Sequence, residues 1–285
     1  MIDLMLKGGT HPVMTIVGES WRFIDTGPLD GPANMAVDEA LLEHFHPETS
    51  QPVLRLYGWH PPAFSLGRYQ QAAEVLDLEL CAERGVPVVR RITGGGLIYH
   101  AEELTYSIVC APKHIAEAGT VKESFARLCG FLIRTYGRLG LKAGFAVDNT
   151  PAGTRLGGRT AFCFAGKEEY DVVVAGRKLG GNAQRRTKRL IFQHGSMPLR
   201  PALSSAIPFL REKMSALDKS TASLAELGVA VDEEALKQTV AECFAETMGV
   251  ILQTDALTAG ELETGRQLEE KKYGSFSWNA HGITG

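Results

Sequence analysis

Apolar residues recur at three- and four-residue steps in three stretches of the chain, and this spacing predicts amphipathic helices. The first stretch covers residues 32–45, and we expect Asn34 to cap it. The second covers residues 120–140 and ends at Gly140; its apolar face is formed by Val121, Phe125, Leu128, Leu132, Tyr136 and Leu139. The third covers residues 232–249, with Leu236, Val240, Phe244 and Met248 on one stripe.

Shorter apolar runs bounded by glycine and proline predict strands. They lie at residues 21–31, 53–59, 63–70 and 86–111, and the last run has a glycine-rich turn between two strands. Two further runs, at residues 169–176 and 190–199, flank a glycine-bounded turn and predict an antiparallel hairpin. Short turns connect most strands, and helices do not alternate strictly with them. We therefore expect an α+β fold, with a mixed, largely antiparallel sheet core flanked by helices.

Composition and charge narrow the class of protein. The chain has 285 residues, of which 44% are hydrophobic and 22% charged, and its net charge is −3. We expect no nucleic-acid binding, because there is no basic surplus, and no membrane association, because no apolar stretch is long enough. The five cysteines are odd in number and form no Cys-x-x-Cys pair, which argues against a disulfide framework and a cysteine-rich zinc site. These features predict a cytoplasmic protein with reduced thiols.

The stretch RRITGGGLIYH, Arg90 to His100, contains three consecutive glycines after a predicted strand. Without Cβ atoms the backbone can approach a ligand closely, and its amides can form a concavity for an anion. No Gly-Lys-Ser/Thr follows, so this is not a P-loop. A plain tight hairpin is the alternative. His100 has no partner at metal-ligand spacing, so we predict no metal site, and a structural histidine is the alternative to a functional one.

A second glycine-rich stretch, VAGRKLGGNAQRR, runs from Val174 to Arg186. Gly176 and Gly180-Gly181 bracket Lys178, and small or polar residues continue for longer than a hairpin turn requires. The excess predicts the lining of a site for an extended molecule. A solvated lysine in a turn is the alternative.

Cys163 lies in the apolar segment FCF, fifteen residues before Lys178. A buried thiol without a cation nearby has a raised pKa and is inert, so a core residue is one interpretation. A neighbouring ammonium would favour the thiolate and stabilise an oxyanion on a thioester carbonyl. A Cys–His dyad with His100 or His194 is also open from the residues alone.

Four blocks in this order, NMAVDEALL, RRITGGGLIYHAEELTYS, GRKLGGNAQRR and FQHGSMPL, resemble the lipoate-protein ligase and biotin-ligase superfamily. The resemblance covers about Trp21 to Leu199, with a weaker similarity in KKYGSFSWN. It implies the catalytic-domain fold of that superfamily over residues 21–250, after an N-terminal extension of residues 1–20 and before a helical C-terminal tail of residues 251–285. Cys163 stands where cysteine-dependent octanoyltransferases of this superfamily carry their acyl-accepting cysteine.

The resemblance implies transfer of an octanoyl group from octanoyl-acyl carrier protein to a lysine of a lipoyl-accepting protein, such as the glycine-cleavage H protein, in lipoate biosynthesis. Cys163 would carry the octanoyl group as a thioester and Lys178 would assist it, with no cofactor and no ATP. The substrate-binding residues implied are Arg91, Thr93, Gly94, Gly95, Gly96, His100, Gly176, Gly181, Asn182 and Ala183. Burying the eight-carbon chain would contribute about 0.8 kcal/mol per CH₂.

Two related activities remain as alternatives. Gly96 and Leu97 stand where many such transferases have a bulkier residue and then alanine, and a triple glycine is frequent in the ATP-dependent lipoate-protein ligases. The related amidotransferases, which move octanoyl between lipoyl domains, usually have an asparagine where Thr105 stands. A biotin ligase and a non-enzymatic lipoyl-domain binding protein rank lower.

The basic cluster Arg185, Arg186, Lys188 and Arg189 has two interpretations. Acyl carrier proteins are acidic, and these side chains could steer one toward the site. A solvated hairpin end is the alternative.

Overall fold

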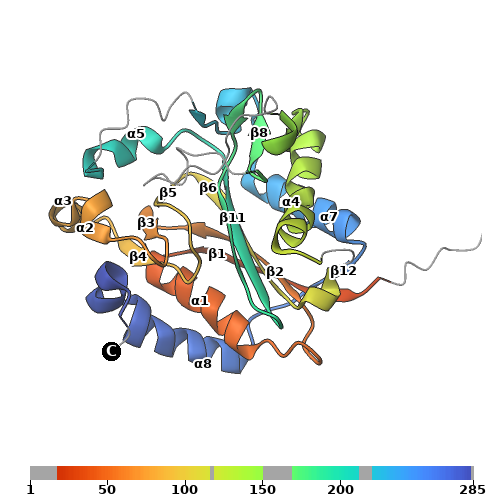
Figure 1. The fold of residues 1–285 in the computed structure, drawn as a ribbon, viewed down its shortest axis with the longest axis horizontal. Coiled ribbons are helices and arrows are strands. Elements are labelled where there is room, and N and C mark those ends of the chain that lie inside the picture. The colour runs from red at the N-terminus through yellow and green to blue at the C-terminus, as the bar shows by residue number, and fades with distance from the viewer. Residues whose placement is uncertain (1–17, 116–118, 150–168, 212–219, 284–285) are drawn as a thin grey trace, which may run out of the picture.

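A mixed β-sheet runs through the middle of the molecule and carries helices on both faces (Figure 1). The computed structural model describes residues 18–115, 119–149, 169–211 and 220–283. The strands are β1 (Ser20–Leu29), β2 (Val53–Trp59), β3 (Ala63–Leu66), β4 (Val88–Arg90), β5 (Ile98–His100), β6 (Glu103–Cys110), β7 (Ala143–Phe145), β8 (Val172–Val174), β9 (Arg177–Lys178), β10 (Asn182–Arg186), β11 (Ile191–Pro198) and β12 (Ile251–Thr254). The helices are α1 (Gly31–His44), α2 (Ala72–Val75), α3 (Leu78–Glu83), α4 (Val121–Arg138), α5 (Leu203–Ala206), α7 (Glu233–Met248) and α8 (Ala259–Leu268). Single helical turns are η1 (Pro112–His114), η2 (Val147–Asn149), η3 (Ile207–Phe209), η4 (Ala225–Leu227), η5 (Glu269–Tyr273) and η6 (Ser277–His281).

The main sheet has the strand order β10-β11-β6-β2-β1-β12. Neighbours from β10 to β2 are antiparallel, whereas β1 runs parallel to both β2 and β12. The predicted fold class, a mixed and largely antiparallel sheet flanked by helices, is confirmed.

Alternate residues of the central strands enter two separate hydrophobic cores, because successive side chains of a strand point to opposite faces. Leu54 and Leu56 of β2 join the core beneath α4 and α7, where Leu132 and Phe244 are buried. Val53 and Tyr57 of the same strand join the core beneath α1 and the C-terminal segment. Both faces of the sheet are therefore covered, and a charged residue on a central strand must find its partner inside the protein.

Two of the predicted helices differ from expectation at their N-termini. Asn34 does not cap α1: Asp30 accepts a hydrogen bond from the backbone N–H of Ala33, and the helix begins at Gly31 with Pro32 next to it. Thr120 and Glu123 form a reciprocal capping box on α4, so Val121 occupies its first turn and is 58% exposed, outside the buried face predicted for it.

The triple-glycine segment is not the turn of a hairpin. The strands before and after it, β4 and β5, lie on opposite sides of β3 in a second sheet of order β4-β3-β5. Residues 91–97 therefore cross the end of β3 as a loop, the glycine loop. This crossing is close, because a Cβ on Gly67 would lie 2.0 Å from the carbonyl oxygen of Gly95.

The hairpin predicted between residues 169–176 and 190–199 is also wrong. The first run forms β8, which pairs with β7 and β9 in a third sheet, and the second forms β11, which pairs with β10 and β6. The exposed turn Ala175-Gly176, with both residues at positive φ, closes the β8–β9 hairpin early. Lys178 and Asn182 are thereby placed in different sheets.

The last part of the chain packs onto the same sheet. Residues 251–254 form the edge strand β12, and α8 lies along α1 (Figure 1). Tyr273 and Trp278 are buried in the core beneath α1. Within the described residues, no helix has the length and apolar character needed to cross a membrane.

Candidate functional site

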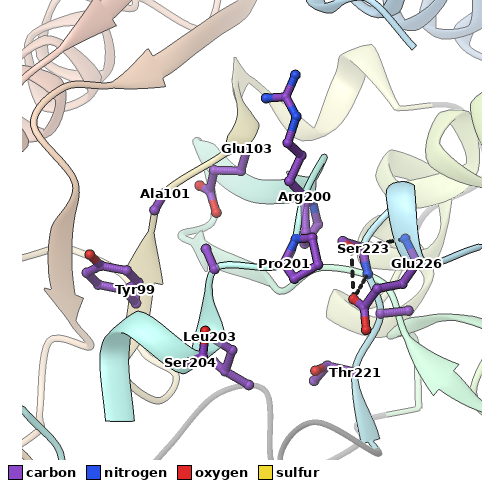
Figure 2. Close-up of a pocket in the computed structure, with 13 residues that line it drawn as sticks. Tyr99, Ala101, Glu103, Arg200, Pro201, Leu203, Ser204, Thr221, Ser223 and Glu226 are labelled. Carbon is purple, nitrogen blue, oxygen red and sulfur yellow. Dashed lines mark hydrogen bonds between the residues drawn. The ribbon is translucent and has the colours of Figure 1, made fainter. Parts of the chain in front are cut away.

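A pocket of about 320 Å³ lies beside the end of β5 (Figure 2). Its wall includes Tyr99 and Glu103 on one side and Ser223 and Glu226 on the other. Glu226 accepts hydrogen bonds from the backbone N–H and the hydroxyl of Ser223 through one carboxylate oxygen and from Arg177 through the other, so both of its oxygens already have partners. Glu103 instead connects the pocket to a buried polar chain that ends at the glycine loop.

This chain runs through His100, whose two ring nitrogens are both hydrogen-bonded. Nδ1 donates to Glu103 Oε1 over 2.6 Å, and Nε2 lies 2.7 Å from the hydroxyl of Ser65. Ser65 Oγ also accepts from Arg91 Nη1, so its own proton is available for His100. The imidazole stacks on Trp59, with ring centroids 3.8 Å apart. His100 is therefore connected to the glycine loop through Ser65 and Arg91. Its predicted contact with substrate stays a prediction.

Arg91 holds the glycine loop in shape. Its guanidinium, 1% exposed, donates to the carbonyl oxygens of Ser65, Gly94 and Gly96. Gly95 has a φ of +96°, a conformation that L side chains rarely adopt. Because two carbonyls of the loop and one of β3 bind the same buried cation, the loop is fixed in position before any ligand arrives.

Thr93 of the same loop is joined to β11 by His194. Thr93 Oγ1 and His194 Nε2 are 2.7 Å apart, and both residues are buried. Burial first, and then the positive charge of Arg91, hold the pKa of His194 well below its usual value, although the carboxylate of Asp38 lies 4.0 Å from Nδ1. The imidazole is therefore neutral near pH 7, and its Nε2 can accept the Thr93 proton.

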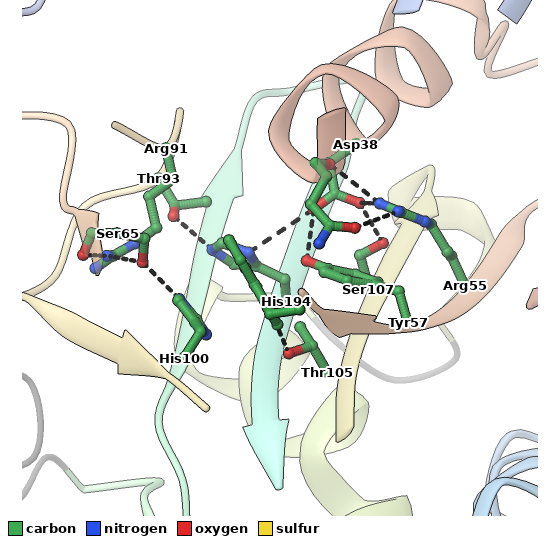
Figure 3. Close-up of polar contacts among 12 residues, drawn as sticks. Asp38, Arg55, Tyr57, Ser65, Arg91, Thr93, His100, Thr105, Ser107 and His194 are labelled. Carbon is green, nitrogen blue, oxygen red and sulfur yellow. Dashed lines mark hydrogen bonds and ion pairs between the residues drawn. The ribbon is translucent and has the colours of Figure 1, made fainter. Parts of the chain in front are cut away.

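On the side of His194 opposite Thr93 lies a buried ion pair between α1 and β2 (Figure 3). Arg55, with no exposed side-chain surface, donates to Asp38 Oδ1 over 2.7 Å. Asp38 also accepts from the hydroxyls of Tyr57 and Ser107. Burial and the nearby carboxylate raise the pKa of Tyr57 well above its usual value, so its hydroxyl stays protonated and donates.

Lys178 is buried, which excludes the alternative of a solvated turn residue. Its exposure is 2%, and its ammonium lies 2.7 Å from Asp171 Oδ2, a carboxylate that is buried as well. Its backbone carbonyl accepts from the N–H of Ala222, next to the pocket of Figure 2. Cys163, the predicted nucleophile, lies outside the described residues.

The remaining predicted site residues divide into two groups. Ala183 pairs with His194 and Asn182 with Gly195 in the β10–β11 ladder, while the carbonyl of Gly181 accepts from Ser196, so these three lie near the loop of Thr93. Asn182 Oδ1 accepts from the hydroxyl of Tyr106. Gly176 lies apart from them, in the exposed β8–β9 turn.

The basic cluster is also divided. Arg186 is bound at the N-terminus of α4, where it donates to the Thr120 carbonyl and the Ser124 hydroxyl. Arg185, Lys188 and Arg189 are exposed.

Sequence reasoning missed the buried pair of Asp38 and Arg55. A signal was present: each is a charged residue inside an otherwise apolar run, NMAVDEALL and VLRLYGW, and a charge there is buried with a partner. Chemically, the structure provides a glycine loop held rigidly by Arg91 with the neutral imidazole of His194 beside it, and, in a separate sheet, the buried ammonium of Lys178 paired with Asp171. Backbone amides and a buried cation are groups that stabilise negative charge on a carbonyl oxygen.

The chain is similar in sequence to one protein family and to proteins named octanoyltransferases, and similar in fold to solved lipoate-protein ligase structures. The chain matches the lipoyl protein ligase A/B catalytic domain over residues 30–245. It is 38% identical over 271 residues to a protein of Kyrpidia tusciae named Octanoyltransferase LipM, covering 92% of this chain and 98% of that protein. It is 34% identical over 274 residues to the protein of the same name in Bacillus subtilis, again covering 92% and 98%.

Solved structures of lipoate-protein ligases have the same fold as this chain. A lipoate-protein ligase A bound with ATP superimposes with a TM-score of 0.78 at 23% identity, over 93% of this chain and 100% of that one. A putative lipoate protein ligase from T. acidophilum with bound lipoic acid gives a TM-score of 0.76, also at 23% identity, and the same coverage.

Proposed function

The chain belongs to the lipoyl protein ligase A/B catalytic-domain family and, within it, to the octanoyltransferases, and from this membership we propose that it transfers octanoyl from octanoyl-acyl carrier protein to a lysine of a lipoyl-accepting protein. It is thus an acyltransferase of lipoate biosynthesis. The observation that carries the proposal is the match to octanoyltransferases over almost the whole chain. The ligase structures share the fold at 23% identity, and they support no ATP-dependent step here.

The reaction has two balanced steps. The Cys163 thiolate attacks the thioester carbonyl of the donor, the bond to the carrier sulfur breaks, and the carrier leaves as a thiolate that takes a proton from water, while the octanoyl-enzyme thioester forms. The neutral amine of the acceptor lysine then attacks that thioester, an amide forms as the amine gives up one proton to water, and the bond to sulfur breaks to release the Cys163 thiolate. The ammonium of Lys178 favours the thiolate and stabilises the oxyanion in both steps.

The other cysteines support this choice of nucleophile. Burial raises the pKa of Cys81 to about 11 and that of Cys129 to about 12, and it raises the pKa values of Cys110 and Cys243 as well. Among the described cysteines none is therefore poised as a thiolate at neutral pH. Lys178 is buried, and the electrostatic effect of its ammonium on a nearby thiolate or oxyanion is stronger there than in bulk water. As the acceptor we propose the glycine-cleavage H protein.

Intact-protein mass spectrometry tests the proposal. Mixing the protein with octanoyl-acyl carrier protein, without ATP, should add one octanoyl group that hydroxylamine removes and that Cys163→Ala lacks. Adding the H protein should then discharge the adduct. Loading only from octanoyl-H protein would identify the amidotransferase instead. No adduct without ATP, combined with lipoylation from ATP and free acid, would identify a ligase and refute the proposal.

A further inference from the structure

A second cleft, with a volume of about 670 Å³, opens on the other side of the glycine loop, between that loop and the C-terminal segment. Gly94 of the loop lines it, together with Arg68, Arg185 of β10, Lys272 and Trp278. The reaction described above uses none of the side chains that line this cleft. The cleft is therefore a candidate for a binding site distinct from the buried network around His194.

The cleft carries a surplus of positive charge. Three cations line it, Arg68, Arg185 and Lys272, against one carboxylate, Glu39, which binds Lys272 at 2.6 Å. No hydrogen bond or ion pair joins the guanidinium of Arg68 or Arg185 to another side chain in the described ranges. Arg68 lies over Trp278, with its central carbon 4.6 Å from the ring centroid. Two guanidinium groups thus face the cleft with their donors available.

The walls of the cleft are held rigidly by Arg90. This guanidinium is 1% exposed and donates to the carbonyls of residues 67, 68 and 70 on one side and of residues 278, 279 and 280 on the other. Trp278 Nε1 donates back to the carbonyl of Arg90. Because Arg90 fixes the backbone on both sides, Arg68 and Trp278 are in place before a ligand binds, and little ordering is needed.

We propose that this cleft binds the phosphodiester of the phosphopantetheine arm that carries the octanoyl group on acyl carrier protein. The inference rests on the proposed function and adds the site at which the donor is recognised. Guanidinium groups bind phosphate oxygens in forked pairs, and such charge-assisted bonds are stronger than neutral ones. The thioester at the end of the flexible arm would then reach the reaction site across the glycine loop.

The surface next to the cleft fits the rest of the donor. Arg185 also lines a neighbouring depression of about 630 Å³, whose other lining residues include the cations Lys188 and Arg189 and the carboxylates Glu39 and Glu43. Glu39 is paired with Lys272, so the exposed cations Arg185, Lys188 and Arg189 outnumber the remaining carboxylate there, and the acidic body of the carrier protein would lie against them.

The test compares two donors that differ only in the phosphate: octanoyl-phosphopantetheine and octanoyl-pantetheine. The measurement is kcat/KM for formation of the octanoyl-enzyme. The wild-type protein should prefer the phosphorylated donor, and Arg68→Gln or Arg185→Gln should lower kcat/KM for that donor roughly tenfold to a hundredfold. The rate with octanoyl-pantetheine should not change, nor should discharge of preformed octanoyl-enzyme to the acceptor.

Two variants control for folding and general charge. Arg68→Lys keeps the cation and should retain part of the preference. Arg134→Gln removes an exposed arginine from α4, where it pairs with Glu246 of α7, and should behave as wild type. Equal losses with both donors in Arg68→Gln, or a wild-type protein without any preference, would overturn the inference.

Calorimetry with unacylated phosphopantetheine and pantetheine separates this inference from the proposed function, because it needs no catalysis. If no donor acylates the wild-type protein, the proposed function fails, and tighter binding of phosphopantetheine, lost in Arg68→Gln, would still support the phosphate site. Binding of ATP that is lost in Arg68→Gln, without discrimination between the two pantetheines, would assign the cleft to a nucleotide and overturn the inference.

Discussion

Replacing Arg55 by methionine should destabilise the protein strongly, because it leaves a carboxylate buried without its counter-ion. Arg55 has no exposed side-chain surface, and it donates to Asp38, to Thr26 Oγ1, and to both the backbone and side-chain oxygens of Asn34. Methionine fills much of the same volume, so the lost charge and hydrogen bonds dominate the effect. Without Arg55, the carboxylate of Asp38, 2% exposed, keeps the hydrogen bonds from the hydroxyls of Tyr57 and Ser107 but has no full positive charge paired with it among the described residues.

The expected loss is about 3–5 kcal/mol in the free energy of unfolding, the usual result of removing one partner of a buried pair. The free energy of unfolding of a single domain is about 5–15 kcal/mol, so the variant should remain folded but be only marginally stable. Adding Asp38→Asn removes the stranded charge while keeping an oxygen acceptor for one hydroxyl. The double variant should therefore recover part of the stability lost in Arg55→Met.

Urea unfolding followed by circular dichroism and tryptophan fluorescence measures these differences. Arg138→Met is the matched control, since Arg138 pairs with Glu242 and Glu246 on the surface and its loss should barely move the midpoint. The reasoning is refuted if Arg55→Met unfolds at nearly the urea concentration of Arg138→Met, or if the double variant is less stable than Arg55→Met.

Three further predictions concern the site itself. The pKa of His194 is lower in the folded than in the unfolded protein, so the unfolded state takes up the proton first as the pH falls. The contribution of His194 to the free energy of unfolding is therefore full above about pH 6.5 and decreases below it. In His194→Gln, the melting temperature should fall less steeply as the pH is lowered. Gly67→Ala places a Cβ 2.0 Å from the carbonyl oxygen of Gly95, and by displacing the glycine loop it should reduce the rate of acyl-enzyme formation at least tenfold. Gly137→Ala, in α4 with open space around it, is the control: it should leave this rate unchanged and raise the melting temperature. Lys178→Arg keeps the positive charge beside Asp171 but not the compact ammonium, and the initial rate of acyl-enzyme formation should fall roughly a hundredfold while the melting temperature holds; an unchanged rate would remove Lys178 from the reaction.

The sequence by itself determined the elements whose signals are local. The periodicity of residues 120–140 and 232–249 predicted α4 and α7, and three consecutive glycines marked the glycine loop. The ordered blocks also led to the family that the comparisons show. A helix requires partners only three or four residues away, so its pattern is complete within the segment that forms it.

Only the tertiary structure decided which segments meet. The glycine loop resembles a hairpin in sequence because the chain does not show that β3 lies between β4 and β5. The six carbonyls around Arg90 come from segments 20–23 and 188–190 residues away, and Arg55 finds Asp38 on another element, 17 residues earlier. A buried cation needs some partner, but the hydrophobic pattern does not specify which one, because that choice depends on how two sheets and the C-terminal segment pack around it.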